Sequence, residues 1–134
     1  MLYIWHLTVT AGTEEKAPAE EKVTTRSGVI TKLEIKFARG CHGLVYATIS
    51  DSLTQLLPFN AKGGAAADDE TVGGAYFWEL LKSKPELILR AWSPDATYDH
   101  KITFRVNILP QKVATMIPVI DLLTRLLRRM GVIR

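Results

Sequence analysis

The amino-acid sequence predicts an antiparallel β-sandwich of about eight short strands, followed by an amphipathic helix at the C-terminus. Residues 28–37 alternate apolar and polar side chains with a period of two, which is typical of a half-buried strand. Similar segments recur along residues 1–110, separated by turn signals and with no helical pattern between them. Residues 111–134 then change to steps of three and four residues, which indicates a helix.

Size and composition narrow the class of protein. The chain has 134 residues, enough for one domain with a substantial core. Cys41 is the single cysteine, so an intramolecular disulfide is excluded, and with it the disulfide-rich class of secreted proteins. The first ten residues lack the basic region and unbroken apolar run of a signal peptide, and no apolar stretch reaches the ~18 residues of a membrane span. The sequence therefore predicts neither a signal peptide nor a transmembrane segment.

The positive charge is concentrated at the C-terminus. The formal net charge is +3, and residues 111–134 carry five basic side chains against Asp121 alone. The first 110 residues carry 12 basic and 13 acidic side chains. The basic character therefore belongs to the tail, and it does not indicate a domain that binds a specific nucleic acid.

The first half of the chain predicts four strands. An alternating segment begins at Tyr3 and runs to Thr10, with β-branched and aromatic residues that favour a strand. Residues 11–22 are rich in glutamate and predict an exposed loop. A short strand over 23–26, the central strand over 28–37 and a strand over 45–50 follow, separated by glycine turns.

The second half of the chain predicts the remaining strands. The segment 61–75 contains four glycines and three consecutive acids, and we interpret it as a long mobile loop. Residues 76–81 are predicted as a strand or a short helical turn. Further strands are predicted over 52–59, 87–92 and 102–108.

Short strands with these turns favour a jelly roll or a similar Greek-key connection, with an all-β enzyme fold as the alternative. The predicted units are a β-sandwich at 1–110 and a helical arm at 111–134.

The predicted arm is amphipathic. Pro118 either kinks the helix or marks its start, and Gly131 is expected to end it. Its apolar face is too wide to rest in solvent, so we expect another surface to cover it. That surface is the sandwich itself, a neighbouring subunit, or a membrane surface. The residues predicted to form an interface are Met116, Ile117, Ile120, Leu123, Leu127 and Met130 of the arm, together with Trp92.

The motifs of catalysis and metal binding are missing from the sequence. The three histidines are scattered, and no His-x-x-x-His, Cys-x-x-Cys, P-loop or Gly-x-Ser-x-Gly motif occurs. Cys41 and His42 are adjacent, but a buried cysteine beside a turn histidine explains them better than half a metal site. Asp68, Asp69 and Glu70 form either a solvated loop, which we favour, or a calcium site with Asp95 or Asp99. The sequence therefore predicts no catalytic, cofactor-binding or metal-binding residues.

The aromatic residues leave a second hypothesis open. Most are expected to fill the core or an interface, but together they also suit a platform on which a sugar ring stacks. Trp92 points away from the side of Leu89 and Ala91 in the alternation, so it is the best candidate for an exposed or interfacial ring. The aromatic residues in question are Trp5, Tyr46, Tyr76, Trp78, Trp92 and Tyr98.

The whole pattern, with Gly-Val-Ile-Thr-Lys-Leu-Glu-Ile at 28–35 and Ala-Trp-Ser-Pro-Asp-Ala-Thr-Tyr-Asp-His at 91–100, resembles the single-jelly-roll structural proteins of virus and phage particles. This resemblance implies repeated copies, contacts through strand edges and arms, and no enzymatic role. It predicts a virion component, such as a minor capsid or capsid-decorating protein, whose partners are itself or other shell proteins. The alternative is a non-catalytic module that binds carbohydrate or another cell-surface ligand, and an enzyme with a site built from distant loops is a third hypothesis.

Overall fold

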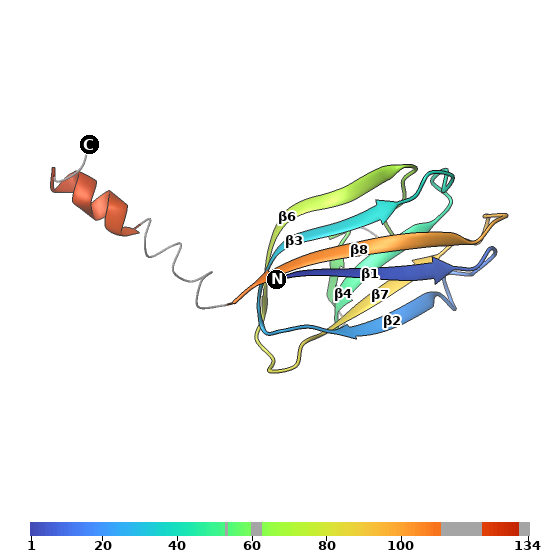
Figure 1. Cartoon of the computed structure of the whole chain (residues 1–134), viewed down its shortest axis with the longest axis horizontal. Coiled ribbons are helices and arrows are strands. Elements are labelled where there is room, and N and C mark those ends of the chain that lie inside the picture. The colour runs from blue at the N-terminus through green and yellow to red at the C-terminus, as the bar shows by residue number, and fades with distance from the viewer. Residues whose placement is uncertain (53, 60–62, 111–121, 132–134) are drawn as a thin grey trace.

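The computed structural model describes residues 1–52, 54–59, 63–110 and 122–131 (Figure 1). Within these ranges, eight strands form two four-stranded sheets packed face to face, and a helix spans residues 122–129. The predicted β-sandwich is therefore confirmed. The strands are β1 (Leu2–Val9), β2 (Ala19–Thr24), β3 (Gly28–Phe37), β4 (Tyr46–Asp51), β5 (Thr54–Leu57), β6 (Glu70–Leu80), β7 (Glu86–Trp92) and β8 (His100–Leu109).

The strand order is that of a jelly roll. One sheet has the order β1-β8-β3-β6, the other has the order β2-β7-β4-β5, and neighbouring strands are antiparallel. The pairs β1–β8, β2–β7, β3–β6 and β4–β5 are nested, so the first half of the strand series folds back along the second half. This folded-back ribbon then wraps into two sheets through the β3–β8 and β4–β7 pairs. The predicted jelly-roll connection is confirmed.

The core lies between the inner faces of the two sheets. In β8, Phe104 and Val106 are fully buried, whereas Arg105 between them faces outward. In β3, Ile35 and Phe37 follow the same pattern. Because side chains alternate between faces, this period of two fixes both the strand register and the buried face. The largest fully buried side chains come from both sheets and are Phe37, Phe104, Ile30, Leu33, Ile35, Ile49, Leu56, Leu87, Leu89, Ile102, Ile108 and Val9.

Two predicted loops are partly strand. β2 begins at Ala19, inside the segment expected to be an exposed loop, because residues 19–24 pair with β7 although most of their side chains are polar. β6 begins at Glu70, so the prediction of a loop over the whole of 61–75 is wrong. Gly73 and Gly74, which contributed to the prediction of a long mobile loop, pair with β3 in that strand. The later part of β6 also decides that residues 76–80 form a strand and not a helical turn.

Several aromatic side chains close the sandwich. Tyr3 and Trp5 stack with ring centroids 5.4 Å apart and pack against the core. The Trp78 indole Nε1 donates a hydrogen bond to Asp51 Oδ2 at 2.9 Å, which links β6 to β4 across the two sheets. Tyr98, by contrast, is 75% exposed. Most of these rings therefore contribute to packing, as expected.

The described part of the arm is helical, as predicted. Gly131 has a φ of 74°, and its N–H donates a hydrogen bond to the Arg128 carbonyl oxygen at 3.1 Å, which ends the helix as expected. Pro118 and the predicted interface residues Met116, Ile117 and Ile120 lie outside the described residues. Within residues 122–131 and the rest of the described chain, no helix is long and apolar enough to cross a membrane.

Candidate functional site

The helix presents an exposed apolar face, which we call the arm face. Its side chains are Leu122, Leu123, Leu126, Leu127 and Met130, with exposed fractions of 58%, 53%, 47%, 38% and 73%. Successive helical residues are separated by about 100°, so these five positions fall within an arc of about 140°. Figure 1 shows the helix apart from the two sheets, in agreement with this exposure.

The rest of the helix surface is largely basic. Arg128 lies opposite the arm face, and Arg125 and Arg129 lie toward its Leu122 edge, with Arg128 and Arg129 near the C-terminal end, where the helix dipole favours positive charge. Leu123, Leu127 and Met130, which the sequence predicts as interface residues, all belong to the arm face. Their contact with a partner stays a prediction.

Trp92 is buried, so of the two alternatives predicted for its ring, exposed or interfacial, the exposed one is wrong. The residue lies on the outer face of its sheet, on the side away from Leu89 and Ala91, yet it is only 7% exposed. Tyr46, its neighbour on β4, stacks on it with ring centroids 6.0 Å apart and an interplanar angle of 16°. The segment at Gly64 also covers it, because a Cβ there would lie 3.0 Å from Trp92 Cη2. A role for Trp92 in an interface stays a prediction.

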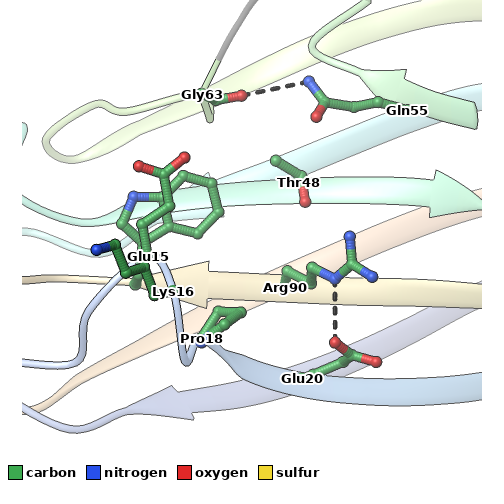
Figure 2. A pocket seen from close by; sticks show the side chains of 9 residues that line it. Glu15, Lys16, Pro18, Glu20, Thr48, Gln55, Gly63 and Arg90 are labelled. Atoms are coloured by element: carbon green, nitrogen blue, oxygen red, sulfur yellow. Dashed lines mark hydrogen bonds and ion pairs between the residues drawn. The ribbon is translucent and has the colours of Figure 1, made fainter. Parts of the chain in front are cut away.

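The outer face of the sheet β2-β7-β4-β5 has a hollow that Trp92 helps to line. Figure 2 shows the side chains around it. We call this hollow the sheet groove, and its volume is about 380 Å³. Its lining includes the buried residues Thr48 and Trp92 and part of the segment before β2. The residues that line the sheet groove are Glu15, Lys16, Pro18, Glu20, Thr48, Gln55, Gly63, Arg90 and Trp92.

Three of the polar residues that line the groove are cross-strand neighbours. Glu20 of β2 and Thr48 of β4 are both register partners of Arg90 on β7. Arg90 Nε donates a hydrogen bond to Glu20 Oε2 at 3.0 Å (Figure 2), and both side chains remain partly exposed. Thr48 is only 3% exposed, and its hydroxyl oxygen is not among the buried polar atoms without a partner in the described residues. The hydroxyl is therefore open to the sheet groove.

A second hollow continues the sheet groove. It has a volume of about 290 Å³ and shares Glu15, Gly63 and Trp92 with the first. Tyr46 and Asp95 are added to its lining. The two hollows therefore adjoin, and both have aromatic and polar residues in their lining.

Sequence reasoning missed the sheet groove. Its main polar residues, Glu20, Thr48 and Arg90, come from three strands and are far apart in the chain. Each occupies an outward position of its strand, but only the register of β2, β7 and β4 brings them together. Outward polar positions are common on solvated sheets, so they gave no distinctive signal.

The pair Cys41–His42 does not form half a metal site. Cys41 is fully buried, while the side chain of His42 is 74% exposed. Burial raises the pKa of the Cys41 thiol, and the negative charge of Asp68 raises it further. Across the part of the chain that the structure describes, no group of three or more His, Cys, Asp or Glu side chains is placed to hold a metal ion.

Asp68 stabilises the turn after β3 instead of binding a cation with its neighbours. Its Oδ1 accepts hydrogen bonds from the backbone N–H groups of Gly40 at 2.8 Å and His42 at 3.1 Å. His42 has a φ of 50°, a left-handed conformation that this carboxylate helps to hold. These backbone hydrogen bonds, with a smaller contribution from the charge of His42, lower the pKa of Asp68.

This lowered pKa predicts a specific dependence of stability on pH. Because the folded pKa lies below the unfolded value of about 4, the unfolded chain takes up the proton first as the pH falls. The stabilisation from Asp68 is therefore complete above that value and is lost as the pH falls through the folded pKa. We expect Asp68→Asn to be less stable than the parent at neutral pH and the difference to shrink in acid, as measured by urea unfolding. A difference that stays constant with pH would contradict this.

Comparison with known proteins supports the fold. No protein-family model matches the chain, and no curated protein matches it in sequence. The chain is similar to one in the capsid asymmetric unit of cyanophage Pam1, with a TM-score of 0.51, 11% sequence identity, and coverage of 78% of this chain and 81% of that chain. The fold is shared with a phage capsid chain. The predicted resemblance in architecture to viral and phage jelly-roll proteins is therefore confirmed at the level of the fold.

Two further solved structures are similar over most of this chain. The crystal structure of PirA gives a TM-score of 0.43 with 10% identity, and covers 79% of this chain and 93% of that chain. The solution structure of a de novo designed double-stranded β-helix gives a TM-score of 0.39 with 18% sequence identity, and the match covers 78% of this chain and 99% of that chain. Both are less similar in structure than the phage chain and add nothing to the assignment of the fold.

Proposed function

We propose that this chain is a structural assembly protein, a component of a virus or phage particle that serves as a minor shell subunit or decorates the shell. The arm face carries the proposal, because five large apolar side chains on one side of a helix lie exposed. Such a face is stabilised when another protein surface covers it. The fold shared with a phage capsid chain supports a particle shell as the setting, and the proposal assigns the chain no catalytic role.

The partner proposed for the arm face is the arm of a second copy. Two such helices can pack antiparallel through their apolar sides, with the side chains of one filling the grooves of the other. Arg128 would then remain on the outside, Arg125 and Arg129 would lie at the edge of the contact, and the two C-terminal ends would lie far apart. A two-fold contact of this kind uses the same surface on both subunits, so a single sequence satisfies both sides.

Light scattering coupled to size exclusion tests this proposal. We expect the full chain to have at least twice the mass of one subunit, and a chain that ends at Pro110 to be a folded monomer. Replacing Leu123 and Leu127 together by Glu removes apolar burial and introduces charge, so it should weaken association at least about 100-fold.

Arg128→Gln is the matched control, because it changes the opposite side of the same helix and should leave the mass unaltered. A full chain that remains monomeric at high concentration would contradict self-association. So would a Leu123→Glu, Leu127→Glu variant that keeps the parent mass.

A further inference from the structure

We infer that the sheet groove is a binding site for a neutral polyhydroxylated ligand, a saccharide. This function is separate from assembly, because the groove lies on the outer face of β2, β7 and β4 while the arm face lies on the C-terminal helix. The volume of about 380 Å³ falls within the range of roughly 300–1,000 Å³ that is typical of small-molecule sites. The adjoining hollow extends it toward Tyr46 and Asp95.

The charges of the groove favour a neutral ligand. Glu15 and Glu20 carry negative charge, and Lys16 and Arg90 carry an equal positive charge, so the groove attracts neither anions nor cations overall. Donors and acceptors are instead mixed at short range, with the Arg90 guanidinium beside the Glu20 carboxylate. Adjacent hydroxyl groups on a ligand, each both donor and acceptor, suit such a mixture.

Thr48 places a hydroxyl in the groove. The residue is only 3% exposed and lines the groove, yet its oxygen is not among the buried polar atoms without a partner in the described residues, so this hydroxyl is open to the groove. Figure 2 shows this hydroxyl on the side of Thr48 that faces Arg90. A ligand hydroxyl placed between Thr48 and Arg90 can accept a hydrogen bond from the guanidinium and exchange one with the Thr48 hydroxyl, in place of water.

The aromatic pair provides the apolar part of the site. Trp92 is 7% exposed, and the small exposed area borders both hollows. Tyr46 stacks on it and fixes its orientation. A sugar presents C–H groups as well as hydroxyls, so its apolar side can lie along this rigid edge while its hydroxyls reach Thr48, Arg90 and Glu20.

An array of printed neutral and acidic oligosaccharides, probed with the full chain, tests the inference. We expect binding to neutral oligosaccharides, and the strongest of these then serves as the titrant in calorimetry. Thr48→Val keeps the side-chain shape and removes only a hydroxyl that is open to the groove, so the fold should be as stable as the parent. The affinity should fall by about tenfold, the value of one hydrogen bond. Arg90→Gln should weaken binding by at least as much.

Thr8→Val is the matched control, because Thr8 is exposed on the outer face of the other sheet and should not affect the affinity. The Leu123→Glu, Leu127→Glu variant should also bind normally, which separates this inference from the proposed role in assembly. A blank array, binding confined to acidic oligosaccharides, or an affinity that Thr48→Val leaves unchanged would overturn the inference.

Discussion

Phe104→Ala is expected to lower the free energy of unfolding by about 3–5 kcal/mol, because it removes a fully buried ring from the centre of the sandwich. Phe104 lies on β8 between Trp5 of β1 and Ile35 of β3, with neighbours on both sides that the sheet holds in place. These neighbours cannot collapse fully into the space left by the ring, so a cavity adds to the lost burial. For a domain with a total stability of about 5–15 kcal/mol, this is a large fraction.

Phe77→Ala is the control for this loss. Phe77 has the same side chain but is 67% exposed on β6, so its removal should change the stability by no more than about 0.5 kcal/mol. Urea unfolding followed by circular dichroism measures both variants. Similar losses for the two would show that Phe104 is not part of the core as described.

Gly73→Ala is expected to be at least as damaging, with a loss of about 4 kcal/mol or more. Gly73 has a φ of 114°, a conformation that residues with a Cβ rarely adopt. A Cβ added there would also overlap the carbonyl oxygen of Leu33 in the paired strand β3. Because backbone cannot move aside as a side chain can, the pairing of β3 with β6 would have to break locally. Thermal unfolding, or loss of soluble folded protein, is the measurement.

Gly74→Ala separates the cost of a positive φ from the cost of the overlap with the Leu33 carbonyl oxygen. Gly74 also has a positive φ, of 152°, but a Cβ there would meet no atom within 4 Å. Backbone strain alone costs about 1–3 kcal/mol, so this variant should lose less stability than Gly73→Ala. Equal losses in the two variants would mean that the overlap with Leu33 makes no contribution.

The sequence was informative wherever burial on one face imposed a period of two. β3 and β8 were predicted closely because Leu33, Ile35, Phe104 and Val106 alternate with polar residues. The helix at 122–129 was predicted from apolar residues that recur at steps of three and four. β2 and the start of β6 were missed because these segments are rich in glutamate and glycine, so they show no apolar alternation. Their place in the sheets depends on backbone pairing with β7 and β3.

Contacts between distant segments were beyond the reach of local patterns. The side of the sheet on which Trp92 lies follows from alternation, but its burial depends on Tyr46 and on the segment at Gly64. The sheet groove likewise exists because the register places Glu20, Arg90 and Thr48 side by side. Predicting either feature requires the order of the strands, and short-range periodicity does not contain that order.

The pairing of β1 with β8 has a practical consequence for labelling and display. Since the two strands are antiparallel neighbours, the chain enters and leaves the sandwich at one end, where the Met1 amino group donates to the Ile108 carbonyl oxygen at 2.6 Å. A fluorescent protein or peptide tag fused before Met1 would therefore emerge beside the root of the arm. The turns at 38–44 and 93–99 lie at the opposite end, next to the last residues of β3 and β7. Cargo inserted in the exposed turn around Tyr98 would leave the arm unobstructed.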